Sequence, residues 1–349
     1  MVMKELHLHI GRHKTGSSTL QHFLSINAEA LRSDGFYYPK NPAYFWQGEH
    51  SHSFLAHSFK TERPHYLPSH ATYEAEHAWQ SLYDDVAQRA GEKLLLSSEH
   101  FCSLNTAASV SQLADRLAPL IDVSQIYVYC YVRRQDELFE SEYKQNIKSG
   151  DHSSTVHERL FDRLSEKPNA YDYYDFLSVW EQCFDADKVT LVPFERGQLH
   201  NASIIDDFMN RLSLFDLSSY RRISDQNLAM PAELIELLRI ISPSVNKEQY
   251  RVLRSWLTNH VNSFDRRPVT LLTDNMRKVI FERYKEQNLL VAKNKLGRKD
   301  GVLFKDEIAE KPVFLGLSTE RTASLMSQII LSDVNRLAKL QRKIADIKN

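Results

Sequence analysis

The chain has 349 residues, 42% of them hydrophobic, which is enough to bury a full core in one large domain or two smaller ones. Its 44 lysines and arginines balance 45 aspartates and glutamates, which excludes a general basic field for nucleic acid or for an anionic membrane surface. Any anion-binding site must therefore be built locally from specific residues.

Cysteine usage and the N-terminal segment indicate the compartment. Cys102, Cys130 and Cys183 are too few and too scattered for a disulfide framework or a zinc site, so a reducing cytosol fits best. Residues 1–5 lead straight into an apolar run and leave no room for a signal peptide, and no apolar run approaches the roughly 20 residues that cross a bilayer. We therefore expect a cytoplasmic protein with no transmembrane segment.

Short apolar runs bounded by polar turns predict five strands. They occupy residues 5–10, 36–38, 94–96, 126–132 and 189–192. Each gap leaves enough chain for a helix, a spacing typical of a parallel α/β sheet flanked by helices. A helical repeat from Leu20 to Leu31 predicts a first helix that ends at Gly35, before the second strand.

Residues 40–75 are rich in His, Tyr, Phe, Pro and Ser and show no clear periodicity. They predict an ordered loop over the carboxyl edge of the sheet, where open α/β folds bind ligands. The aromatic and polar side chains suit contacts with a carbohydrate or glycolipid, although the same composition suits an ordinary packed loop.

The last third of the chain is largely helical in pattern. Helices are predicted near 203–213, 231–241, 247–261 and 274–295, and another over 318–349. In this last helix Ile330, Leu337, Leu340, Ile344 and Ile347 form a partial heptad seam that Asp333 interrupts, which is compatible with a helix docked on its own domain or with a dimerising coiled coil. We expect one domain over residues 1–304 and a C-terminal extension over 305–349.

A glycine-rich segment, residues 11–18, connects the first strand to the first helix and is called the phosphate loop below. Gly11 and Gly16 have the spacing that lets backbone N–H groups surround an anion at a helix N-terminus. In a nucleoside triphosphatase a lysine follows the second glycine, whereas here Ser17 holds that position and Lys14 lies two residues before Gly16. The displaced lysine predicts a leaving group different from that of a nucleoside triphosphatase.

A second anion-binding pattern follows the fourth strand. Arg133 ends that strand, and Ser141 lies eight positions later on the predicted next helix. An arginine fork with a nearby hydroxyl suits a terminal phosphate dianion and faces the same sheet edge as the phosphate loop. Two anion sites on one edge indicate a ligand with phosphates at both ends.

These two segments resemble the sulfotransferases that use 3′-phosphoadenosine-5′-phosphosulfate (PAPS), in particular their bacterial carbohydrate-modifying branch. The phosphate loop is similar to that family's 5′-phosphosulfate loop, and Arg133 and Ser141 match its 3′-phosphate motif in residue type and spacing. Looser similarity extends through residues 94–99, 189–195 and 288–304. The resemblance implies the P-loop nucleotide-kinase-like sulfotransferase fold with a five-stranded parallel sheet, PAPS as co-substrate, adenosine 3′,5′-bisphosphate as product, and no required metal.

The resemblance also implies which residues bind the donor: Arg12, His13, Lys14, Thr15, Gly16, Ser17, Ser18, Arg133, Ser141 and Arg298. Arg298 belongs to a segment that is loosely similar to the family's loop over the 3′-phosphate. The sequence departs from the family at the adenine, because Thr19 stands where cytosolic members commonly have a tryptophan and Phe194 where they have a tyrosine.

Sulfuryl transfer needs in-line geometry and stabilisation of the charge that builds on the leaving group, and Lys14 is placed to supply that charge stabilisation. The acceptor hydroxyl needs a base, for which Glu99 and His52 are the two candidates. Glu99 follows the third strand and resembles in position the family's catalytic histidine, while His52 resembles a histidine that often precedes a Leu-Ala pair in the bacterial branch.

The expected partner is a hydroxyl-bearing acceptor, in particular a saccharide or glycolipid, and not a nucleic acid. A homodimer through the C-terminal helix is a further expectation. Two other functional classes stay open: a Mg²⁺-dependent nucleotide kinase-like phosphotransferase, and a non-catalytic nucleotide-binding module. No metal site is expected, since no group of histidines has a metal-ligand spacing with a carboxylate or thiolate partner.

Overall fold

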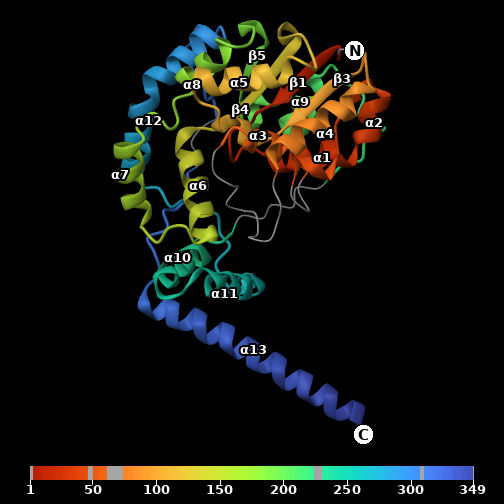
Figure 1. The fold of residues 1–349 in the computed structure, drawn as a ribbon. Coiled ribbons are helices and arrows are strands. Elements are labelled where there is room, and N and C mark those ends of the chain that lie inside the picture. Colours follow the sequence, from red (N-terminus) through yellow and green to blue (C-terminus); the bar gives the residue numbers. More distant parts are fainter. Residues whose placement is uncertain (1–2, 46–49, 61–73, 224–229, 307–309, 349) are drawn as a thin grey trace. The chain divides into compact units, whose positions relative to one another are not determined.

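The computed structural model describes residues 3–45, 50–60, 74–223, 230–306 and 310–348 (Figure 1). Contacts group the chain into two compact units. The first combines 1–135, 171–225 and 283–307, and the second combines 136–170, 226–282 and 308–349. The expected division into one domain over 1–304 and a C-terminal extension over 305–349 stays a prediction.

The first unit contains a five-stranded parallel sheet, which confirms the predicted α/β fold class. Its strands are β1 (Glu5–His9), β2 (Phe36–Tyr37), β3 (Lys93–Ser97), β4 (Ile126–Val132) and β5 (Val189–Pro193), in the order β2-β3-β1-β4-β5. β1 is central and pairs in parallel with β3 and with β4. The chain therefore reverses its direction of strand addition beside β1, which is where open parallel sheets bind ligands.

Both faces of the sheet are covered. Leu6 and Leu8 on one face of β1 are fully buried, and His7 and His9, which alternate with them on the other face, are buried as well. The histidine face packs against α1 (Ser17–Ile26) and α9 (Ile204–Arg211), which contact each other. The remaining helices of this unit include α3 (Ser53–His57), α4 (Ala75–Ala87), α5 (Ala107–Leu117) and α8 (Tyr173–Glu181).

The predicted first helix is interrupted, so its expected continuity to Gly35 is wrong. α1 ends at Ile26, and a separate α2 (Ala28–Ser33) follows. The side chain of Asn27 donates to the carbonyl of Arg221 at 3.0 Å and accepts from the Arg221 amide at 2.7 Å. Asn27 thus bonds a segment far along the chain, and the helix breaks at this residue.

The second unit is helical, which agrees with the expected helical C-terminal part. Its helices are α6 (Gln135–Ser149), α7 (Val156–Glu166), α10 (Ala232–Ile241), α11 (Lys247–Asn259), α12 (Asp274–Leu290) and α13 (Thr319–Lys348). The first residue of α6, Gln135, still belongs to the first unit. The part of α12 from Arg283 onward also belongs to the first unit. In the described part of the chain, no helix is both long enough and apolar enough to cross a membrane.

The first turns of α13 dock on their own unit. Leu325 and Ile329 are fully buried in its core, and Asp333, which interrupts the heptad seam, accepts a hydrogen bond from the Trp256 indole at 2.6 Å. Ile330, Leu331, Val334 and Leu337 of the same helix are exposed. These contacts favour a helix docked on its own unit over a dimerising coiled coil. Dimerisation through the exposed part of α13 stays a prediction.

Candidate functional site

The phosphate loop leaves the central strand at the point where the sheet changes direction. The amides of Ile10 and Arg12 donate to the carbonyls of Tyr129 and Tyr131 at 3.0 and 3.1 Å, so pairing with β4 continues past the end of β1. On the other side the Ser98 amide donates to the His9 carbonyl. The loop is thus held between the carboxyl ends of β3 and β4.

The loop backbone has three left-handed residues, with φ of 43° at Gly11, 68° at Lys14 and 78° at Gly16. Glycine adopts this conformation freely, but at a lysine it costs roughly 1–2 kcal/mol. A side chain at Gly16 would also lie 3.3 Å from the Phe194 ring. Strain at a lysine within a turn that leads to a helix N-terminus is typical of a ligand-binding loop.

The free amides of α1 complete the cradle. Gly16 occupies the N-cap of α1 without a side-chain cap, and no acidic residue lies in the first turn. The unsatisfied N–H groups and the positive end of the helix dipole are therefore available to an anion. Ser18 is exposed at this end, whereas Thr15 is fully buried and its hydroxyl donates to the Arg12 carbonyl at 2.6 Å. Thr15 closes the loop in this structure.

Two of the three arginines named for donor binding, Arg12 and Arg133, contact the phosphate loop or its supports. Arg133 Nη1 donates to the Lys14 carbonyl at 3.3 Å, and the Tyr173 hydroxyl in turn donates to the Arg133 carbonyl. The Arg12 guanidinium lies over the rings of Tyr173 and Phe176, at 5.5 and 4.8 Å from their centroids. The Arg133 guanidinium is thus directed toward the loop, and Arg12 anchors the loop to α8.

Arg298 holds its own segment closed. Its guanidinium donates to the carbonyls of Val302 and Leu303 and to the side chain of Gln198, just after β5. The same segment is fixed by Arg134, which donates to the Asp306 carbonyl. The segment therefore lies across the carboxyl ends of β4 and β5. Ser141 lies on α6 in the second unit, and a donor contact from Ser141 or Arg298 stays a prediction.

Glu99 lies just after β3, at the start of a short 3₁₀ helix, Glu99–Ser103. Its carboxylate accepts a hydrogen bond from the Gln21 amide of α1 at 2.7 Å. Burial alone would raise the pKa of Glu99, but His100, the Gln21 amide and His13 outweigh it and hold the pKa below its ordinary value. Glu99 is therefore an ionised, oriented carboxylate beside α1.

His52 is only 1% exposed and is bonded through both ring nitrogens. Its Nδ1 accepts from the Ser97 amide at 3.0 Å, and its Nε2 donates to the Pro39 carbonyl at 3.0 Å. Burial, which outweighs the two backbone carbonyls, lowers the pKa of His52 to about 4. The side chain ties the residues after β2 to the end of β3. Its assignment as the base stays a prediction, but Nδ1, the ring nitrogen that could accept a proton, already accepts from the Ser97 amide.

Three buried histidines make the stability of the fold sensitive to acid. The pKa values of His7, His9 and His52 are each lowered by burial to about 4, against an ordinary 6.5. The folded protein then binds fewer protons than the unfolded chain between these values, so stability is complete above pH 6.5 and is lost as the pH falls toward 4.

We expect each of these histidines to remove about 2 kcal/mol of unfolding free energy between pH 7 and pH 5. Urea unfolding at both pH values measures the loss. His52→Asn should reduce the pH dependence by about one proton, whereas the control variant His77→Asn, at an exposed position of α4, should not change it. Equal slopes for the His52 variant and the wild type would contradict the assignment of a neutral buried imidazole.

Two polar residues of the site were not predicted from sequence. Gln21 orients Glu99, and His9, fully buried at the end of β1, places its Nδ1 2.7 Å from the Ser97 hydroxyl. A histidine within an apolar strand directly before the loop was the only signal for His9. Gln21 had none, since its partner lies 78 residues away.

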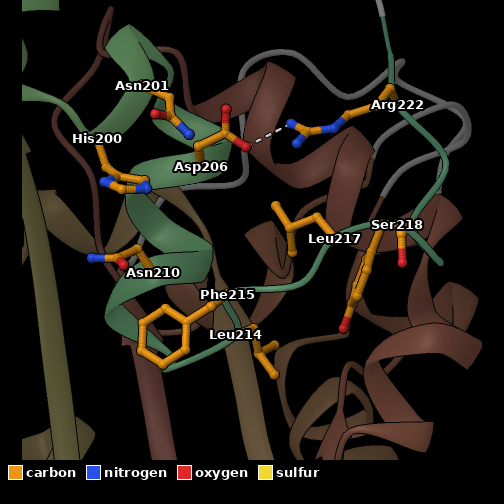
Figure 2. Close-up of a pocket in the computed structure, with 10 residues that line it drawn as sticks. His200, Asn201, Asp206, Asn210, Leu214, Phe215, Leu217, Ser218 and Arg222 are labelled. Carbon is orange, nitrogen blue, oxygen red and sulfur yellow. Dashed lines mark hydrogen bonds and ion pairs between the residues drawn. The ribbon is translucent and has the colours of Figure 1, made fainter.

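A separate cavity of about 590 Å³ lies between α9 and the segment that follows it (Figure 2). Asn201, Asp206 and Asn210 line it, together with the exposed ring of Phe215. Asp206 and Arg222 are paired at 2.6 Å, so opposite charges cancel within the cavity. No phosphate-loop residue lines it. Across the described ranges, no cluster of three or more His, Cys, Asp or Glu side chains has the arrangement of a metal site.

Comparison with known proteins gives two similarities. An uncharacterized protein of Archaeoglobus fulgidus is 25% identical over 228 residues, which are 62% of this chain and 57% of that protein. The chain therefore spans little more than half the length of this relative. The crystal structure of a sulfotransferase from Alicyclobacillus acidocaldarius matches 71% of this chain and 95% of its own, with a TM-score of 0.38 and 16% identity. No family model matches the sequence.

Proposed function

We propose that the protein is a PAPS-dependent sulfotransferase that transfers the sulfuryl group to a hydroxyl acceptor. The observation that carries this proposal is the meeting of the two anion motifs, because the Arg133 guanidinium donates to the carbonyl of the strained Lys14. Lys14 and Arg133 can then each bind one end of a doubly anionic nucleotide along the edge formed by β1 and β4. The resemblance of both segments to PAPS-dependent enzymes supports the same ligand.

In the proposed reaction the acceptor oxygen attacks sulfur in line with the leaving 5′-phosphate. Glu99 takes the hydroxyl proton as the new S–O bond forms, and the S–O bond to the phosphate breaks. The negative charge that develops on the bridging oxygen is stabilised by Lys14 and by the amides at the start of α1. Adenosine 3′,5′-bisphosphate leaves with that charge.

Glu99 is the preferred base because its carboxylate is ionised and oriented, whereas both nitrogens of His52 bond the backbone. The acceptor class is proposed to be a saccharide or glycolipid. Part of the region expected to recognise it, residues 46–49 and 61–73, lies outside the described residues. Transfer of labelled sulfate from PAPS to a fractionated cell-envelope extract identifies the product.

A kinase-like phosphotransferase is the second candidate, favoured by the phosphate loop on a parallel sheet. The position after Gly16, where such an enzyme has its lysine, is occupied by Ser17, which is buried. The proposal therefore assigns the loop to a phosphosulfate and not to a nucleoside triphosphate.

Ligand-induced thermal shifts distinguish the candidates. Adenosine 3′,5′-bisphosphate at about 100 times its Kd should stabilise the protein by about 2.7 kcal/mol without Mg²⁺. ATP that stabilises only with Mg²⁺ would overturn the proposal in favour of the kinase. Tight binding of the bisphosphate without label transfer to any acceptor fraction would instead indicate a non-catalytic binding module.

A further inference from the structure

Two buried polar atoms lie beneath the phosphate loop with no hydrogen-bond partner among the described residues: Nε2 of His9 and Oγ of Ser17. His9 is completely buried and Ser17 is 5% exposed. A buried polar group without a partner costs about 1–3 kcal/mol, so such groups call for a physical explanation.

The two atoms lie close to the same place, the position that a side chain on Gly11 would occupy. An ideal Cβ on Gly11 would lie 2.8 Å from Ser17 Oγ and 3.3 Å from His9 Nε2. Gly11 therefore has to lack a side chain for both groups to approach the loop. The Ser17 hydroxyl can change its direction by rotation about a single bond, which is the freedom that a bond to His9 requires.

The other ring nitrogen determines which proton His9 carries. The Ser97 hydroxyl lies 2.7 Å from His9 Nδ1, its hydrogen-bond partner within the described chain. A Ser97 hydroxyl that donates to Nδ1 leaves the ring proton on Nε2, whereas the opposite direction would leave both the Ser97 hydrogen and the Nε2 lone pair unused. Burial lowers the pKa of His9 to about 4, so the ring is neutral and carries one proton at pH 7.

We propose that His9 is a positioning residue for the donor site: its Nε2–H donates to Ser17 Oγ and fixes the first turn of α1, whose amides receive the anion. Ser17 is the first residue of that helix, and the proposed bond would extend the Ser97–His9 contact between β3 and β1 to the loop. His9 touches no substrate and acts only through Ser17. This inference rests on the proposed function for the identity of the anion, adenosine 3′,5′-bisphosphate.

A double-mutant cycle on the affinity for adenosine 3′,5′-bisphosphate tests the inference. His9→Asn and Ser17→Ala should each weaken binding about tenfold, and the double variant should bind within about twofold of Ser17→Ala, because the two residues act as one unit. His9→Gln, which can place an N–H near the position of Nε2, should recover most of the affinity. Losses that multiply in the double variant would overturn the coupling.

The matched control is His7→Asn. His7 lies on the same face of β1, is also buried, with 5% exposure, and bonds the Tyr129 hydroxyl at 2.9 Å instead of the loop support. Its replacement should destabilise the fold but leave nucleotide affinity unchanged. Equal losses of affinity in the His7 and His9 variants would reduce His9 to a packing residue.

Nitrogen-15 NMR of the His9 ring gives a readout that needs no nucleotide. The Nε2–H tautomer is expected in the wild type, and a mixture of tautomers in Ser97→Ala. An Nδ1–H tautomer in the wild type would overturn the inference whether or not the nucleotide binds. Absence of bisphosphate binding by the wild type, with the Nε2–H tautomer present, would instead overturn the proposed function.

Discussion

Lys14→Ala is expected to lower the rate of sulfuryl transfer by about 10²-fold or more while the protein stays folded. The lysine stabilises charge that exists on the bridging oxygen only as the S–O bond breaks, so its loss should reduce kcat more than donor affinity. Transfer of labelled sulfate from PAPS measures the rate, and calorimetry with adenosine 3′,5′-bisphosphate measures the affinity.

The backbone of Lys14 allows a sharper version of this test. Because its φ is 68°, Lys14→Gly should relieve roughly 1–2 kcal/mol of strain, and so raise thermal stability as it removes activity. Lys4→Ala removes an equal charge from an exposed position at the other end of β1 and should leave turnover unchanged. Near-normal turnover of either Lys14 variant would refute the catalytic assignment.

Glu99→Gln is expected to lower kcat by about 10²–10⁴-fold and to remove the acidic limb of the pH–rate profile. The glutamine is close in size and keeps an oxygen that can accept the Gln21 hydrogen bond, so the loss should reflect the missing base and not a displaced helix. The acidic limb in the wild type should fall below the ordinary carboxyl range, since His100, Gln21 and His13 lower the pKa of Glu99 despite its burial.

His52→Asn is the companion variant. It removes the bond from a ring Nε2 to the Pro39 carbonyl, so it should destabilise the protein but retain the acidic limb. The opposite pattern, with the limb kept in Glu99→Gln and lost in His52→Asn, would transfer the role of base to His52. Unfolding curves for both variants separate loss of chemistry from loss of structure.

Several features were predictable because their signals are local. A buried parallel strand is a short, continuous apolar run, so all five strands were found within a residue or two of their observed bounds. The phosphate loop was visible because its glycines are required by its own backbone angles. The helices after residue 230 were predicted for the same reason, since their apolar periodicity lies in adjacent turns.

Long-range partners were not visible in any local pattern. The break at Asn27 depends on Arg221, the orientation of Glu99 on Gln21, and the placement of His52 on the backbone of Ser97. The division of the chain into two units, each assembled from three separate segments, also depends on contacts that no window of sequence contains.

The sequence by itself determined the succession of strands and helices along the chain, the left-handed glycines of the loop, and the cationic residues that follow β1 and β4. Only the tertiary structure decided the hydrogen-bond partners and ionisation states of the buried polar side chains. His52 bonds the backbone, Glu99 is held ionised, and His9 lies under the loop. The physical reason is that periodicity and turn chemistry act between near neighbours. Hydrogen-bond partners and desolvation are instead set by whichever distant segments packing brings together.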